Sequence, residues 1–95
     1  MPHFKKGYLE EIPFKQTVEV MPAQHLYVTQ LDVDAYIIIA RHIPSAVDYV
    51  LATRRDKSGP RVFTHLGRCV QYAVNQFGVT TMHFELLRAL PGDDA

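Results

Sequence analysis

The residues of this sequence that are best suited to bind a ligand are basic and lie close together. Residues 53–68 contain five basic residues and one acidic residue, whereas residues 1–52 contain four basic and six acidic residues. The basic five are Arg54, Arg55, Lys57, Arg61 and Arg68. Guanidinium and ammonium groups bind phosphates and carboxylates. The stretch therefore predicts a contact with DNA or with an acidic protein partner; the alternative is a charged turn that is only solvated.

Tyr72 is the aromatic residue whose position best fits a contact role. On a helix that ends at Gly78 it lies on the polar side, near Arg68 and Gln76. Tyrosine is enriched at protein interfaces. Packing of the N-terminal residues over its ring is the alternative. The predicted contact set is Arg54, Arg55, Lys57, Arg61, Arg68 and Tyr72.

The overall charge bears on the choice of partner. Ten basic and ten acidic residues give a formal net charge of zero. Proteins that bind DNA without sequence preference are normally basic overall, so this neutrality argues against strong non-specific DNA binding. Neutrality also lowers the electrostatic barrier to self-association, so a homodimer is a further partner that the composition allows.

Residue types used in catalysis and metal binding are present, but their spacing fits neither role. No two of the five histidines are four residues apart, and the sequence contains no HExxH motif. Cys69 lies on the apolar side of the predicted helix, where a thiol is buried and unreactive. Residues 58–61 lack the lysine and the spacing of a phosphate-binding loop. We therefore expect no catalytic residue, no cofactor and no metal, and a protein that is not an enzyme.

Length and composition predict one small globular domain. The chain has 95 residues, of which 47% are hydrophobic and 21% charged. One cysteine cannot form an intramolecular disulfide, which fits a reducing compartment. The N-terminal residues resemble no signal peptide, and the longest apolar run, residues 35–40, is far shorter than the roughly 20 residues of a membrane span. We expect a cytoplasmic protein that does not enter a membrane.

The second half of the sequence predicts the elements that would position the basic stretch. Residues 47–54 alternate as a strand does, residues 55–60 have turn chemistry, and residues 61–63 return, which indicates a β-hairpin over 47–63. Thr64 and Gly78 fit the caps of a helix between them. Its apolar face is Leu66, Cys69, Val70, Ala73, Val74 and Phe77. Residues 82–86 predict a last strand.

These elements predict an α+β fold with a C-terminal ββαβ unit over residues 47–87. The expected sheet is three-stranded and mainly antiparallel, with residues 47–54 in its centre. One helix packs on it. Residues 91–95 form a short acidic tail.

The first half gives weaker patterns. Residues 1–13 mix charge and aromatics without a period and predict an irregular arm, and residues 15–20 fit a short strand. Residues 33–43 are ambiguous, because Ala35, Ile38 and Ile39 have helical spacing while Tyr36–Ile39 is β-prone in composition. We predict a helix for this segment, capped by Thr29, with a strand as the alternative. Both options place it in the core.

Residues 47–87 also carry a resemblance. The landmarks are Tyr49 to Arg55, Pro60 to Phe63, the helix up to Gly78, and Phe84-Glu85. This pattern resembles short accessory proteins of bacterial plasmids, prophages and integrative elements, some of them labelled ParC-type partition-associated proteins. The resemblance implies a small cytoplasmic protein that acts beside DNA-maintenance or regulatory proteins. It carries no catalytic residues.

Together these observations predict a non-enzymatic accessory binding protein of a mobile genetic element. Its basic hairpin would contact DNA or an acidic protein. The alternative is a purely protein-binding or self-assembling module without nucleic-acid contact.

Overall fold

The structure is a computed structural model that describes residues 5–20, 25–42, 44–53, 59–79 and 81–86. It contains five strands and two helices. In chain order they are β1 (Lys5–Leu9), α1 (Glu11–Val20), β2 (His25–Asp32), β3 (Ala35–His42), β4 (Val47–Leu51), α2 (Leu66–Phe77) and β5 (His83–Leu86). The fold is α+β, but the predicted three-stranded sheet with a single helix is wrong.

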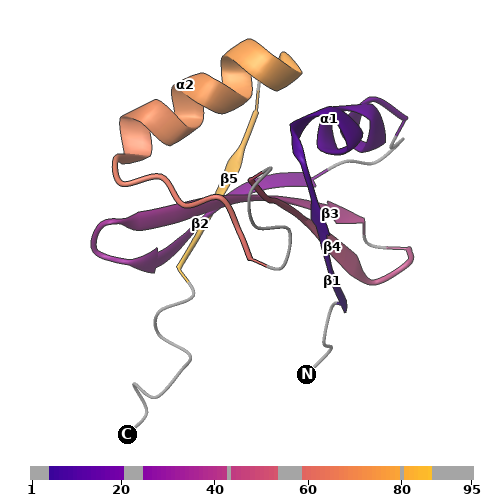
Figure 1. Cartoon of the computed structure of the whole chain (residues 1–95), viewed down its shortest axis with the longest axis horizontal. Helices are drawn as coiled ribbons and strands as arrows, with labels where there is room; N and C mark the ends of the chain where they lie inside the picture. Colours follow the sequence, from indigo (N-terminus) through magenta and orange to yellow (C-terminus); the bar gives the residue numbers. More distant parts are fainter. Residues whose placement is uncertain (1–4, 21–24, 43, 54–58, 80, 87–95) are drawn as a thin grey trace, which may run out of the picture.

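The five strands form one mixed sheet in the order β1-β4-β3-β2-β5. The three central strands β4, β3 and β2 are antiparallel neighbours, whereas β1 pairs with β4 and β5 pairs with β2 in parallel. Both helices cover the same face of this sheet (Figure 1). The two edge strands are therefore β1 and β5.

The segment predicted as a helix over residues 33–43 is a strand. β2 and β3 form an antiparallel hairpin around a turn at Val33 and Asp34, where the Val33 amide donates a hydrogen bond to Asp32 at 2.7 Å. Thr29 lies inside β2 and caps no helix. A continuous apolar run satisfies helical spacing by chance, and β-branched side chains favour the strand that is buried on both faces.

Residues 5–20 form a strand and a helix rather than the irregular arm predicted for residues 1–13, of which residues 1–4 lie outside the described residues. Lys5–Leu9 is β1, and the segment predicted as a strand over 15–20 belongs to α1. Phe14 and Val18, four residues apart, are the buried side of α1. Pro13 fits in the first turn, where a helix does not need its amide.

The predicted hairpin over 47–63 does not form. β4 ends at Leu51, and beyond it residues 59–63 make only isolated bridges, Ala52 with Pro60 and Phe63 with Tyr36 of β3. From Val47 to Val50 both sides of β4 are occupied, by β3 and by β1, so the returning residues reach only its end, where the Arg61 amide donates to Leu51. For the same reason β5 joins β2 and not β4, so the ββαβ topology is wrong.

Helix α2 confirms the strongest local prediction. It runs from Leu66 to Phe77, and Gly78 ends it in the left-handed conformation (φ 63°), with its amide donating to the Val74 carbonyl at 3.0 Å. The N-cap is His65 rather than Thr64, and its side chain makes no capping bond. Of the predicted apolar face, Cys69 and Ala73 are buried, while Leu66, Val70 and Val74 are partly exposed.

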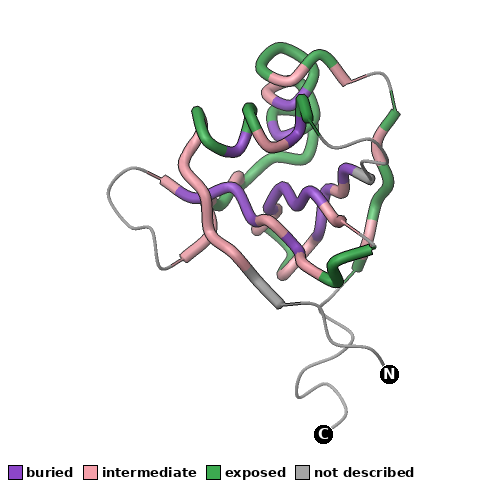
Figure 2. The backbone as a smooth tube through the Cα atoms, turned by 90° about the vertical axis from the view of Figure 1, so that its right-hand side faces the viewer, coloured by how far each residue is buried: buried purple, intermediate pink, exposed green. Residues whose placement is uncertain are grey.

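The main core lies between the helices and the sheet, where buried segments meet in Figure 2. Phe14 of α1 packs against Phe77 of α2 with 5.1 Å between ring centroids. A smaller apolar cluster, Ile37, Ile39 and Val50, lies on the opposite sheet face, as strand alternation requires. None of the helices in the described residues is long and apolar enough to span a membrane.

Candidate functional site

Three of the six predicted contact residues come together on the outer side of α2. Arg61, Arg68 and Tyr72 line a shallow hollow of about 440 Å³. We call this hollow the α2 groove. Its lining is Arg61, Phe63, Gly67, Arg68, Gln71, Tyr72, Asn75 and Gln76. Arg54, Arg55 and Lys57, the other three predicted residues, lie outside the described residues.

The backbone holds Arg61 at the end of this groove. Its amide donates to the Leu51 carbonyl at 2.7 Å, and two residues later Phe63 exchanges two hydrogen bonds with Tyr36, both at 2.8 Å. These bonds attach residues 61–63 to β3 and β4, the middle of the sheet. Arg61 is therefore fixed by the sheet, although it belongs to no strand.

The Arg61 side chain stacks on two aromatic rings. Its guanidinium carbon lies 4.5 Å from the centroid of Tyr72 and 5.0 Å from that of Phe63. The two rings also pack on each other, with 5.2 Å between centroids. Cation–π contacts of this kind orient a guanidinium group before any ligand arrives.

Tyr72 is the base of this stack rather than an exposed contact residue. Its ring also packs edge-on against Phe77, and it belongs to the partly buried rim of the main core. Its hydroxyl is buried and has no partner within hydrogen-bond distance. Burial, followed by interaction with Glu11, raises the pKa of Tyr72 to about 12, although Arg61 acts in the opposite direction. The phenol is therefore neutral at physiological pH.

The α2 groove combines positive charge with amide side chains. Within the described part of the chain neither Arg61 nor Arg68 forms a salt bridge. Gln71, Asn75 and Gln76 supply hydrogen-bond donors and acceptors along the helix. On the other side of Arg61 lies a second hollow, of about 760 Å³, lined in part by Glu10 and Glu11. Arg61 thus separates an acidic surface from the basic and amide-rich one.

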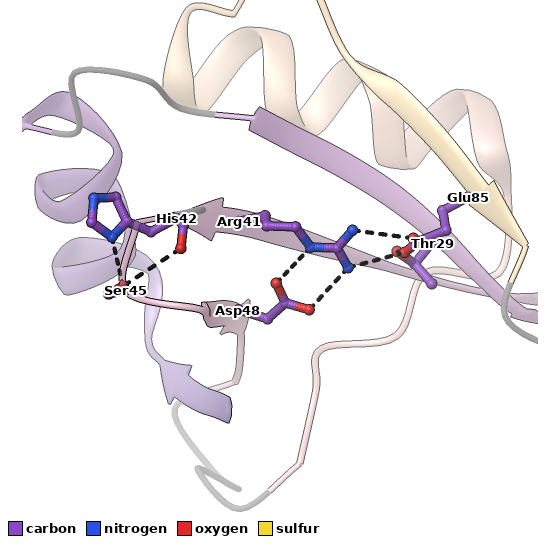
Figure 3. Close-up of polar contacts among 6 residues, drawn as sticks. All are labelled: Thr29, Arg41, His42, Ser45, Asp48 and Glu85. Atoms are coloured by element: carbon purple, nitrogen blue, oxygen red, sulfur yellow. Dashed lines mark hydrogen bonds and ion pairs between the residues drawn. The ribbon is translucent and has the colours of Figure 1, made fainter. Parts of the chain in front are cut away.

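A second polar cluster, which the sequence did not indicate, lies on the sheet face opposite the helices (Figure 3). Arg41 of β3 donates to both carboxylate oxygens of Asp48 on β4, at 2.8 and 3.0 Å. It also donates to Glu85 of β5 at 3.3 and 3.4 Å and lies 4.5 Å from the ring centroid of Tyr27 on β2. Thr29 of β2 donates to Glu85 at 3.3 Å. We call these residues the Arg41 cluster.

The Arg41 cluster joins four strands and has the properties of a structural network. Asp48 is 2% exposed, and both of its carboxylate oxygens accept hydrogen bonds from Arg41 in a bidentate pairing. The carboxylates hold the pKa of Arg41 above its usual value, even though desolvation acts against them. The signal in the sequence was the pairing of Arg41 with Asp48 across a hairpin, which becomes visible only when residues 35–42 are read as a strand.

Other candidate chemistry is weak in the described residues. Burial raises the pKa of the Cys69 thiol to about 12, which makes it a poor nucleophile. In the parts of the chain that the structure describes, no three His, Cys, Asp or Glu residues gather to hold a metal ion. The α2 groove is therefore the candidate binding site.

Comparison of this chain with protein-family models, curated proteins and solved structures finds no match.

Proposed function

We propose that this protein is a non-enzymatic binding protein that holds an acidic segment of a protein partner in the α2 groove. The observation that carries the proposal is the stack of Arg61 on Tyr72 and Phe63 beside a second guanidinium group, that of Arg68. Two cations without an ion pair in the described residues, one of them pre-oriented, suit a carboxylate. The amide side chains along α2 suit the backbone of an extended peptide.

The charge distribution favours an acidic protein over DNA. The net charge is zero, and Glu10 and Glu11 line a hollow that Arg61 borders. A nucleic-acid backbone presents many phosphates in a row, which the nearby carboxylates would repel. DNA remains the second candidate because Arg54, Arg55 and Lys57 belong to the same stretch of sequence as Arg61.

The resemblance to accessory proteins of mobile elements supplies a context for this proposal. It suggests a cytoplasmic partner among plasmid- or prophage-encoded proteins. The helix and the last strand that carried the resemblance exist in the structure, whereas the hairpin does not.

Fluorescence anisotropy with a labelled glutamate-rich peptide tests the proposal. The wild-type protein is expected to bind the peptide at low salt and to lose affinity as the salt concentration rises. Arg68→Gln is expected to weaken binding about tenfold, since a hydrogen bond to a charged group contributes about 1.5 kcal/mol. Lys15→Gln is the matched control: it removes one exposed positive charge from α1, at a residue that does not line the groove.

A second titration with mixed-sequence duplex DNA separates the two candidates. Binding of peptide that is sensitive to Arg68→Gln, without comparable DNA binding, supports the proposal. DNA binding that is sensitive to Arg68→Gln, without peptide binding, would show that the ligand of the α2 groove is nucleic acid and not an acidic protein. Absence of both at low salt, or equal effects of Arg68→Gln and Lys15→Gln, overturns the role of the α2 groove.

A further inference from the structure

Strand β5 combines an open sheet edge with exposed apolar side chains. It is an edge strand, and in the described part of the chain no strand pairs with its outer side. Its residues Phe84 and Leu86 are 53% and 51% exposed, although both are large and apolar. Unpaired backbone groups beside exposed apolar side chains are a template for another strand.

Helix α2 continues this apolar surface. Figure 1 shows α2 lying over the end of the sheet that β5 forms. Leu66, Val70 and Val74 are also partly exposed, and together with Phe84 they line an apolar hollow of about 390 Å³ between α2 and β5. A contiguous exposed apolar surface of this kind marks an interaction site.

The other edge of the sheet has a sequence that opposes pairing. β1 begins with Lys5 and Lys6, followed by Gly7. Lysine in the sequence of an edge strand is one of the ways in which natural proteins avoid association of sheet edges. β5 has the sequence His-Phe-Glu-Leu and no lysine. The two edges therefore differ, and only β5 is suited to receive a strand.

We propose that the occupant of this edge is a second copy of the chain, with β5 pairing antiparallel to β5 of the partner subunit around a two-fold axis at Phe84. The proposal is independent of the acidic ligand of the α2 groove. It joins two five-stranded sheets into one and brings the two apolar hollows together at the seam. A two-fold interface needs a self-complementary surface, and β5 has one.

The register follows from side-chain alternation. Opposite residues of an antiparallel pair share a face, so both α2 helices lie on one side of the joined sheet only if a residue of β5 faces its own copy. Centring on Glu85 would place two carboxylates opposite each other. Centring on Phe84 places His83 opposite Glu85 of the partner subunit and Met82 opposite the partner's Leu86. That register brings two apolar side chains together and sets no two carboxylates opposite each other, while Glu85 keeps its bonds to Arg41 and Thr29.

The helices must take part because the strand is short. A specific interface buries roughly 800 Å² on each partner, which a four-residue strand does not supply alone. The exposed side of α2, Leu66, Val70 and Val74, lies next to the seam and provides the additional apolar area. The dimer therefore depends on both elements.

Light scattering coupled to size-exclusion chromatography tests the assembly on the full chain. The wild-type protein is expected to be a dimer, and Phe84→Lys a monomer, because it places two ammonium groups at the two-fold axis. Val20→Lys is the matched control: Val20 is 77% exposed at the end of α1, which packs over β1 and β4 at the other side of the sheet, and this variant is expected to stay dimeric. Circular dichroism shows whether each variant is folded.

Disulfide trapping tests the register and does not depend on Phe84→Lys being folded. In a Cys69→Ala background, Phe84→Cys is expected to form a covalent dimer on mild oxidation, since opposite Cα atoms about 5 Å apart are within disulfide range. Leu86→Cys is expected not to, because it faces Met82. A wild-type monomer at all concentrations overturns the dimer, and trapping of Leu86→Cys but not Phe84→Cys overturns the register.

Discussion

The guanidinium group of Arg61 lies over the ring of Tyr72, with 4.5 Å between the guanidinium carbon and the ring centroid. Arg61 precedes α2 and is held by the backbone of the sheet, whereas Tyr72 lies in the middle of the helix. The contact therefore joins the sheet to the rim of the α2 groove. It also explains how a residue outside any regular element keeps a defined orientation.

The Tyr72 hydroxyl is expected to contribute nothing to folding. Tyr72→Phe keeps the ring under Arg61 and removes a buried hydroxyl that has no hydrogen-bond partner. We expect the free energy of unfolding to stay the same or to rise by up to about 1 kcal/mol, as measured by urea denaturation. A loss of more than about 1 kcal/mol would show that the hydroxyl is bonded, with Glu11 as the nearest candidate.

Stability is expected to fall at alkaline pH. The pKa values of Cys69 and Tyr72 rise from 9.0 and 10.0 to about 12 in the folded state. Both groups are neutral when protonated, so their contribution is complete below pH 9 and is lost as the pH rises toward 12. Urea unfolding between pH 8 and 11.5 measures this decline. The Cys69→Ala/Tyr72→Phe variant is expected to show a shallower decline, and equal slopes would contradict the assignment.

The Arg41 cluster is expected to dominate the polar contribution to stability. Arg41→Ala leaves Asp48 buried without its partner, which costs about 3 kcal/mol or more. Adding Asp48→Ala is expected to recover part of the loss, because the two residues interact directly. Lys15→Ala, an exposed control, is expected to change stability by less than about 0.5 kcal/mol. Additive effects of the two cluster mutations would show that they are not coupled.

Alanine substitutions of Gly67 in α2 and of Gly78 at its C-cap are expected to change the stability of the protein in opposite directions. Gly78 has a φ of 63°, so Gly78→Ala strains the backbone and is expected to destabilise the protein by about 1 kcal/mol. Gly67 lies in the helix with no atom within 4 Å of an added Cβ. Gly67→Ala is expected to stabilise by up to about 1 kcal/mol. Thermal unfolding measures both, and destabilisation of equal size by the two substitutions would contradict the cap.

The sequence predicted α2 because all of its signals are local: apolar spacing and a glycine at the C-cap. Prediction from the sequence was wrong where the sheet topology depends on which strand pairs with each side of β4. Residues 5–9 have little strand character of their own, yet they pair with β4 and thereby exclude the return strand that residues 61–63 were expected to form. Arg61 lines the α2 groove, but it lies on a segment bridged to β3 and not on a hairpin tip.

The Arg41 cluster was missed for a related reason. Arg41 and Asp48 are seven residues apart, a spacing without meaning on a predicted helix, and they face each other only in the β3–β4 pair. Tyr72 lies on the polar side of α2 as predicted, but helical spacing does not reveal that Arg61 and Phe63 pack on its ring. Both contacts arise from long-range pairing that periodicity does not encode.

The most direct test of the central claim is an NMR titration that observes the Nε–H groups of the arginine side chains while a glutamate-rich peptide is added. Arg41 is an internal reference, because its Nε–H donates to Asp48 at 2.8 Å. Saturable shifts of the Arg61 and Arg68 signals, with the Arg41 signal unchanged, are the predicted result. Absence of shifts at Arg61 and Arg68, or equal shifts at all three arginines, would contradict the assignment of the α2 groove as the binding site.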